Sequence, residues 1–347
     1  MPEIYANDSI VKWNPKENHI PRSVLILGNG FDLDLGIRTK YSHFADSPDW
    51  PFKEINSYED DTLPYFLNLH KSKVDTWFDL EELLASYACK SSGLSKEKII
   101  KAKQDLFVLS NALNEYLVKQ EDDFVKQMND SIGHTKRATP AHCLLLHFLK
   151  KEVRTIYTFN YTNAYRISKQ FILNFDAVFN HIHGSTRENN IILGAGDQRN
   201  LQDDFFEFYK SANPFYKSNN LVEDLNYADE VYIFGHSLGK NDHDYFSDFF
   251  KKVSKSVHRP FAPGKIKVRI FTYDEKSEID LKKQLMILTD NHLIGIYAHC
   301  DFKILKTSNK YYWCPLKVTS IVPMCPQYNQ TNIVDTFSKS KPLNQKA

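Results

Sequence analysis

Short apolar runs recur along the chain, and most of them stop at a glycine or a polar residue. An unbroken apolar run of this length is typical of a strand that is buried on both faces, as in a parallel sheet. Four such runs predict strands at residues 22–27, 153–158, 177–182 and 230–234. A fifth run, Lys265–Thr272, alternates apolar and basic residues, which indicates a strand nearer the edge of the same sheet.

Between these runs, apolar residues lie three and four positions apart, which is the spacing of an amphipathic helix. The spacing predicts one long helix over residues 99–128 and shorter helices over 79–88, 140–149, 241–256 and 275–288. Strands that alternate with helices indicate an α/β protein with a Rossmann-like, mostly parallel, doubly wound sheet.

The same pattern divides the chain into parts. Residues 47–150 contain predicted helices and no evident strand, so we interpret them as a helical insertion between the first two strands. The Rossmann-like core is then expected to consist of residues 20–46 and 151–315. Over residues 316–347 the pattern fades and polar residues become common, which predicts an irregular, flexible tail.

The composition agrees with a globular protein. The chain has 347 residues, of which 42% are hydrophobic and 25% are charged, and this length suits one large domain or two ordinary ones. The 44 basic and 43 acidic residues leave a formal net charge of +1, so no overall field attracts nucleic acid or an anionic membrane. We therefore expect neither of them as a partner.

The five cysteines are scattered and never form a C-x-x-C pair, which argues against a disulfide framework and against a zinc ribbon. No apolar stretch near the N-terminus resembles a signal peptide, and no run approaches the roughly 18 apolar residues of a membrane helix. These features predict a cytoplasmic protein. The sequence also lacks a cluster of Asp, Glu and His suited to paired metal ions, so we expect no metal.

A glycine-containing loop, Gly28-Asn29-Gly30-Phe31-Asp32, directly follows the first predicted strand. Glycine lets the backbone approach a ligand closely, and free N–H groups at the start of a helix can hold a phosphate. The usual dinucleotide fingerprint has a third glycine where this chain has Leu33, so the loop by itself is a weak indication. Asn29 and Asp32 are candidates for contacts with ribose hydroxyls or water, although Asp32 is equally suited to cap the following helix.

Polar residues also follow the second and third strands, at Thr158-Phe159-Asn160 and at His183-Gly184. In an open α/β sheet, ligands bind outside the carboxyl ends of the strands, so we expect these residues to meet the first loop around one ligand. An amide can orient a water or a sugar hydroxyl, and an imidazole can accept its proton at neutral pH. The pair predicts chemistry at a ribose, with Asn160 and His183 as catalytic residues. Taken singly, Asn160 suits a helix cap and His183 a buried structural histidine.

The loop after the fourth strand, Gly235-His236-Ser237-Leu238-Gly239, supports two interpretations. In the first, Gly235 and Gly239 let the backbone pass close to a nucleotide, and His236 is among the residues that bind it. Ser237 donates a hydrogen bond to a phosphate, and Asp242 caps the next helix or contacts a ribose. In the second, the G-x-S-x-G spacing is the nucleophile elbow of an α/β-hydrolase. The partners of Ser237 in such an esterase follow it in the expected chain order: Asp274, then His292 or His299.

The segment Leu27-Gly28-Asn29-Gly30-Phe31-Asp32-Leu33, followed by Thr39, Tyr41 and Phe44, resembles the opening motif of the AbiH family of bacteriophage abortive-infection proteins. Later segments resemble further motifs of that family in the same order: Trp77–Glu81, Phe159–Thr162, His181–Gly184 and the stretch from Gly235 to Asp242. The resemblance covers about residues 24–250. It implies a role in phage defence, in which an infected cell stops growing or dies before it releases virus.

The order of the polar loops is also similar to that of sirtuin-like domains. Those domains carry a G-A-G loop, a T-Q-N-I-D strand end, a catalytic histidine in an H-G pair and a G-x-S stretch beneath the adenosine end of NAD. The resemblance implies that Asn160 positions a water at the nicotinamide ribose and that His183 is the base. Asn29 replaces the alanine, Thr162 replaces the aspartate, and the four zinc cysteines are missing, which argues against protein deacetylation.

Together these features favour a phage-defence effector that binds NAD or a related nucleotide and hydrolyses its glycosidic bond. Glu81 is a further candidate carboxylate, although a glutamate on a helix is more often solvated. Two alternatives stay open, a nucleotide-sensing module without catalysis and a Ser237 esterase. Beyond the nucleotide ligand, the expected partners are a phage-derived trigger, a partner protein that contacts residues 47–150, or a second copy of the chain.

Overall fold

The computed structural model describes residues 20–73, 77–91, 93–130, 139–152, 154–171, 175–255 and 265–308. Six strands form one sheet in which every neighbouring pair is parallel: β1 (Ser23–Leu27), β2 (Arg154–Thr158), β3 (Phe179–His181), β4 (Glu230–Phe234), β5 (Lys267–Thr272) and β6 (Asp301–Lys306). Their order across the sheet is β3-β2-β1-β4-β5-β6, which is that of a Rossmann-like, doubly wound sheet. The predicted fold class is therefore confirmed.

All five predicted strands are present, and the structure adds a sixth. β5 lies one position in from the edge of the sheet, and β6 forms the edge beside it. Phe302 is the buried residue of β6, whereas Asp301 and Lys303 on either side of it are exposed. β6 buries little apolar surface, so its sequence lacks the run that marks β1, β2 and β4.

Helices cover both faces of the sheet. One face carries α1 (Asn29–Leu35) and α6 (Pro140–Leu149), and the other carries α8 (Leu221–Tyr227), α9 (His243–Ser254), α10 (Glu275–Leu288) and α11 (Leu293–His299). Alternate residues of a strand point to opposite faces. Leu25 and Leu27 of β1 therefore pack toward α1 and α6, while Val24 and Ile26 pack toward the other group of helices. This double burial explains why β1 is apolar without interruption.

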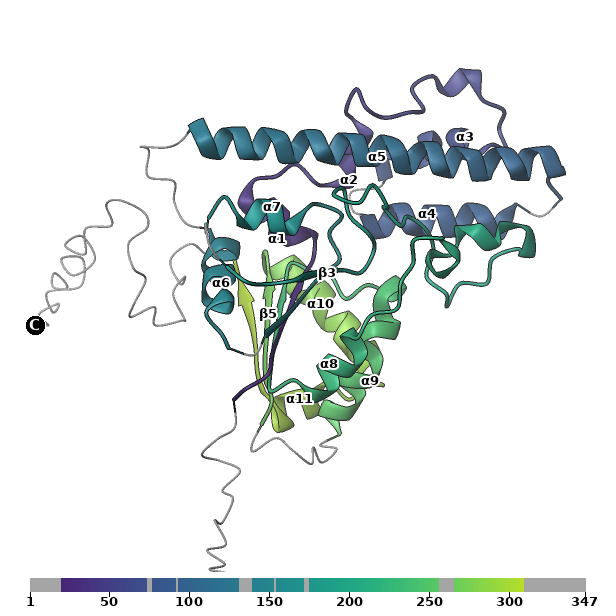
Figure 1. Cartoon of the computed structure of the whole chain (residues 1–347). Helices are drawn as coiled ribbons and strands as arrows, with labels where there is room; N and C mark the ends of the chain where they lie inside the picture. Colours follow the sequence, from purple (N-terminus) through teal and green to yellow (C-terminus); the bar gives the residue numbers. More distant parts are fainter. Residues whose placement is uncertain are drawn as a thin grey trace, which may run out of the picture.

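The chain between β1 and β2 also forms a group of helices with a core of its own. They are α2 (Tyr41–Ala45), α3 (Leu63–His70), α4 (Trp77–Lys90) and α5 (Lys96–Asp130), with short 3-10 turns η1 (Ile55–Ser57) and η2 (Lys71–Lys73). Their buried residues, such as Phe44 and Leu113, pack together. Phe205 and Phe208 from η3 (Asp203–Phe208) join them, so part of the segment between β3 and β4 packs against these helices. Figure 1 shows α5 crossing the end of the sheet at which β1 leads into α1.

The predicted helices correspond to α4, α5, α6 and α10, and to η5 (Lys240–Asp242) followed by α9. The sequence did not predict α2, α3, α7 (Ala164–Ser168), α8 and α11, because helices of five to eight residues carry too few apolar positions to show a period. No helix within the described part of the chain is both long and apolar enough to cross a membrane. The tail predicted at 316–347 lies outside the described residues.

A buried glutamate joins α5 to two loops at the carboxyl end of the sheet. Oε1 of Glu121 accepts hydrogen bonds from the backbone N–H of Asn163, at 2.9 Å, and from the hydroxyl of Thr186, at 2.5 Å. Asn163 follows β2 and begins α7 (Ala164–Ser168), and Thr186 follows β3. Burial raises the pKa of Glu121. Glu121 thus connects α5 to the loops after β2 and β3, both of which the sequence predicts around a ligand.

Candidate functional site

The loops after β1, β2, β3 and β4 meet at the carboxyl end of the sheet around a cavity of about 890 Å³. Pockets for small molecules commonly have volumes of about 300–1,000 Å³. The cavity lies where the strand order reverses between β1 and β4, which is where ligands bind in open α/β sheets. Most of the predicted site residues line it: Gly28, Asn29, Gly30, Asp32, Asn160, His183, Gly235, His236, Ser237 and Asp242.

Three of the predicted binding residues, Phe31, Thr158 and Gly184, support the surrounding structure instead of lining the cavity. The ring of Phe31 packs edge-on against another ring of the sheet core. The hydroxyl of Thr158 accepts a hydrogen bond from the backbone N–H of Asn160 at 3.1 Å. Gly184 has a φ of 75°, and a Cβ at this position would lie 1.9 Å from the carbonyl oxygen of Asn190. Each of the three thus has a structural role that the sequence did not indicate.

The glycines after β1 and β4 allow the backbones of the two loops to approach closely. The N–H of Gly28 donates to the carbonyl oxygen of Phe234, and the N–H of Gly30 donates to that of Gly235, each at 2.9 Å. A Cβ on Gly30 would lie 2.5 Å from Cα of Gly235, and one on Gly28 would lie 2.5 Å from Cα of His236. The N–H groups of Gly28 and Gly30 are therefore bonded to the end of β4 and its loop, and they are not free to hold a phosphate.

Asn160 lines the cavity and carries a buried amide. The residue is 6% exposed, and neither Oδ1 nor Nδ2 has a hydrogen-bond partner among the described residues. An unpaired buried polar group costs on the order of 1–3 kcal/mol, so native structures seldom contain one without a reason. Asn160 does not cap a helix, since the cap of α7 is Asn163, whose side chain accepts the backbone N–H of Arg166. The amide thus lies in the cavity wall beside Asp32, as a candidate for binding a group that enters.

His183 belongs to a buried cluster of charged and titratable side chains. Its Nε2 lies 3.4 Å from Oδ1 of Asp242 and 3.4 Å from Nζ of Lys210. Lys210 in turn lies 2.7 Å from Oε1 of Glu81 and 3.6 Å from Oδ1 of Asp242. His236 contacts the other oxygen of Asp242, with Nε2 and Oδ2 3.4 Å apart. The cluster brings together α4, the loops after β3 and β4, η5 and η4 (Lys210–Ala212).

Burial and neighbouring charges determine the protonation of this cluster. Burial lowers the pKa of His183 to about 3, and Lys210 and His236 act in the same direction, so the imidazole is neutral at pH 7. Burial alone would raise the pKa of Asp242, but Lys210 and the two histidines hold it well below its ordinary value. Burial alone would lower the pKa of Lys210, and the two carboxylates raise it instead. Burial raises the pKa of Glu81 despite the nearby Lys210.

Asp32 places a second unusual carboxyl in the wall of the cavity. It is almost fully buried, and its Oδ2 accepts a hydrogen bond from the hydroxyl of Thr162 at 2.7 Å. Burial raises the pKa of Asp32 to about 7, against the opposing effect of Thr162 and of the nearby Asn160 amide. Asp32 does not cap α1, whose cap position is Gly28. A carboxyl group that titrates near neutral pH therefore adjoins the unpaired amide.

Lys210 is the member of the cluster that the sequence does not reveal. It stands in a segment without strand or helix periodicity, and no motif surrounds it. Lysines are almost always exposed, so only the structure shows that this one is 5% exposed. Glu81 was a candidate from the sequence, and it does line the cavity. Its Oε2 accepts a hydrogen bond from the side-chain amide of Asn241 at 3.0 Å, which fixes the carboxylate beside Lys210.

The residues proposed for a serine esterase lie at opposite ends of the sheet. Ser237 is exposed at the carboxyl end. His292 precedes α11 and His299 is its last residue, and α11 leads into the first residue of β6 at the amino end. Figure 1 likewise shows α11 at the end of the sheet opposite α1. Asp274 uses its carboxylate to cap α10. The Ser237 triad that the sequence left open is therefore not assembled.

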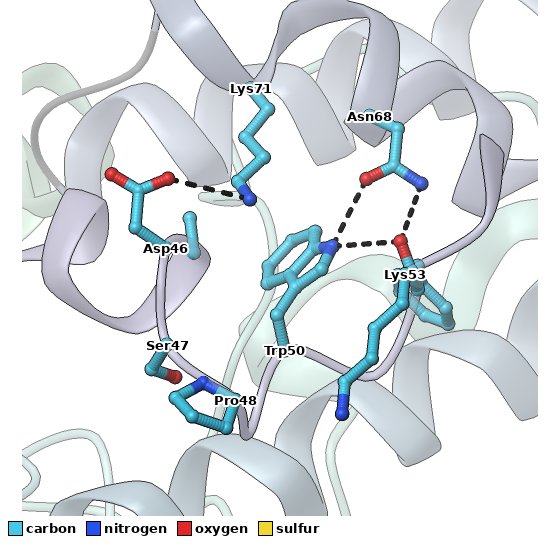
Figure 2. Close-up of a pocket in the computed structure, with 9 residues that line it drawn as sticks. Asp46, Ser47, Pro48, Trp50, Lys53, Asn68 and Lys71 are labelled. Carbon is cyan, nitrogen blue, oxygen red and sulfur yellow. Dashed lines mark hydrogen bonds and ion pairs between the residues drawn. The ribbon is translucent and has the colours of Figure 1, made fainter.

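A second hollow, of about 410 Å³, lies in the helical part beside α2 and α3 (Figure 2). Its polar groups are bonded to one another. The indole N–H of Trp50 donates to the carbonyl oxygen of Phe52 and to Oδ1 of Asn68, and Nδ2 of Asn68 donates to the same carbonyl. Lys71 pairs with Asp46 at 3.4 Å. The cavity at the end of the sheet contains an unpaired amide, so it is the better candidate for the functional site.

Comparison with known proteins identifies the family of the chain. The sequence model of one family, described as bacteriophage abortive infection AbiH, matches residues 24–261. This range is more than half of the chain, and it contains Asn160, His183, Asp242 and Lys210. No curated protein and no solved structure matches the chain. The match confirms the resemblance inferred from the motifs: the chain belongs to the AbiH family of bacteriophage abortive-infection proteins.

Proposed function

We propose that this protein is a cytoplasmic phage-defence effector whose cavity binds NAD or a related nucleotide and hydrolyses its glycosidic bond. The observation that carries the proposal is the unpaired amide of Asn160, which lines the same cavity as the neutral imidazole of His183. Family membership supports the defence role. The position of the cavity at the reversal of strand order supports a nucleotide ligand. The similarity of the loop order to sirtuin-like domains supports NAD.

In the proposed reaction, the Asn160 amide orients a water beside the carbon that joins ribose to nicotinamide. The bond from this carbon to the nicotinamide nitrogen breaks, and its electron pair neutralises the positive ring. The oxygen of the water bonds to the carbon, and its proton passes to the imidazole of His183, which is neutral at pH 7. Asp242, 3.4 Å from the imidazole, stabilises the charge that His183 acquires. The products are nicotinamide and ADP-ribose.

Release of nicotinamide tests the proposal. Purified protein is incubated with NAD, and nicotinamide and ADP-ribose are followed by chromatography. We expect release by the wild type and a loss of about 100-fold or more in Asn160→Ala and in His183→Ala, the size typical of general acid–base catalysis. His299→Ala, which changes an exposed histidine next to β6, is the matched control.

The same variants are then compared in phage-infected cells, because a defence protein can require infection for activity. Cellular NAD should fall in cells that express the wild type and should persist in cells that express either site variant. The proposal is wrong if NAD is unchanged with the wild type both in solution and during infection. It is equally wrong if NAD loss survives both substitutions.

A nucleotide-sensing module without catalysis is the second candidate, and one contact favours it. Nζ of Lys210 lies 3.4 Å from Nε2 of His183 in hydrogen-bonding geometry. A lone pair that accepts this bond is not free to take a proton from water. Saturable binding of a nucleotide without any product would select this function. The helical part would then respond to the ligand through Glu81, which α4 contributes to the cluster.

A further inference from the structure

Asp242 stands at the cap position of α9 but does not act as a cap. Its side chain makes no capping hydrogen bond, and both of its oxygens lie in the buried cluster. Oδ2 lies 3.4 Å from Nε2 of His236. Nδ1 of His236 accepts the backbone N–H of Leu238 at 3.0 Å, so the N–H of the ring is at Nε2 and faces Asp242. One oxygen of the carboxylate is therefore provided with a donor.

The other oxygen, Oδ1, is buried and has no hydrogen-bond partner among the residues that the structure describes. Nε2 of His183 lies 3.4 Å from it, but this imidazole is neutral at pH 7. Nζ of Lys210 lies 3.6 Å from it, but the ammonium is closer to Glu81, at 2.7 Å. Two carboxylates thus share one ammonium, and the negative charge of Asp242 is offset only in part. Asp242 also lines the cavity, so the charge of its buried carboxylate acts at short range on a ligand there.

We infer that the carboxylate of Asp242 attracts the positive charge of the substrate, and that the site therefore selects ribosides whose base is a cation. The inference rests on the proposed function and narrows its substrate class. The oxidised nicotinamide ring of NAD carries a positive charge at the nitrogen bonded to ribose, whereas the reduced ring of NADH is neutral. During cleavage this charge passes from the ring to the ribose carbon, where the same carboxylate stabilises it.

Equilibrium binding to the full-length protein tests the inference. The probes are NADH and carba-NAD, an analogue that keeps the cationic ring but resists cleavage because a methylene replaces the ribose ring oxygen. We expect the wild type to prefer carba-NAD by about tenfold or more, since a unit charge at close range in a buried site contributes at least this factor. Asp242→Asn should bring the ratio of the two affinities close to one. Asp244→Asn, at an exposed carboxylate bonded to Gln198, should leave the ratio unchanged.

A ratio that Asp242→Asn leaves unchanged would overturn the inference, while release of nicotinamide by the wild type would show that the proposed function still holds. If the wild type binds neither probe, both the inference and the proposed function are wrong. Melting temperatures report whether Asp242→Asn is folded. If it is not, the wild type alone decides: the cation 1-methylnicotinamide should displace carba-NAD at a concentration about tenfold lower than neutral nicotinamide. Equal competition by the two compounds would overturn the inference.

Discussion

The backbone N–H of Gly30 donates a hydrogen bond of 2.9 Å to the carbonyl oxygen of Gly235, and so holds the loop after β1 against the loop after β4. Both loops line the cavity, and both lie where the strand order of the sheet reverses. The close approach of two backbones is itself sufficient to require a glycine at each position. The shape of the cavity therefore depends on this contact.

Gly30→Ala is expected to lower the free energy of unfolding by about 1–3 kcal/mol. The added Cβ would lie 2.5 Å from Cα of Gly235, so the two loops would have to separate. Urea denaturation measures the effect. Gly30 lies in α1 without a positive φ, and helix propensity alone would make alanine stabilising by about 1 kcal/mol. Stabilisation would therefore contradict the importance of the contact. Gly93→Ala, at a φ of 85° with open space around it, isolates the cost of backbone strain.

Lys210→Met is expected to destabilise the protein by about 3–5 kcal/mol, because it leaves the carboxylate of Glu81 buried without its counter-ion. Glu81→Gln in the same chain should restore part of this loss. The control is Lys103→Met, which breaks the more exposed pair with Glu207 and should cost less than about 1 kcal/mol. Denaturation of all variants at pH 7 provides the comparison. Equal losses for the two lysines would show that the buried cluster does not depend on Lys210.

The pKa of His183 predicts a loss of stability in acid. It is about 3 in the folded protein against 6.5 as the ordinary value, so between these values only the unfolded chain binds the proton. Stability is therefore retained above about pH 6.5 and falls as the pH drops toward 3, by up to about 1.4 kcal/mol per pH unit. Denaturation at pH 7, 6, 5 and 4 should show a shallower decline in His183→Gln than in the wild type. His299→Gln should follow the wild type, and three parallel curves would contradict the prediction.

Asp32 predicts the opposite dependence on pH. Its pKa is about 7 in the folded protein against an ordinary value of 3.8, so between these values only the unfolded chain loses the proton. Its contribution to stability is therefore complete below about pH 3.8 and is lost as the pH rises through 7. Asp32→Asn keeps the shape of the side chain and removes the titration. We expect this variant to gain stability relative to the wild type between pH 4 and pH 7, whereas Asp244→Asn should show no such trend.

The place of the site could be predicted from the sequence because it follows from parallel topology. Once the runs before Gly28, Asn160 and His183 are recognised as parallel strands, their polar ends must share one edge of the sheet. The strand order is harder to predict, since periodicity does not say that β1 lies next to β4. The contact between the glycine loops depends on that neighbourhood. The burial of Lys210 could not be predicted for a related reason, because it results from the packing of segments that are distant in the chain.

The hydrogen bonds of Glu121 couple any movement of α5 to the loops after β2 and β3. The helix has 35 residues and is therefore about 52 Å long, and the continuous bonding of its backbone makes it stiff. Glu121 binds Asn163 and Thr186, each three positions after a residue proposed for catalysis, Asn160 or His183. Tilting α5 from either end displaces both attachment points together. A molecule that binds α5 far from the cavity can thus change the alignment of the Asn160 amide and the His183 imidazole.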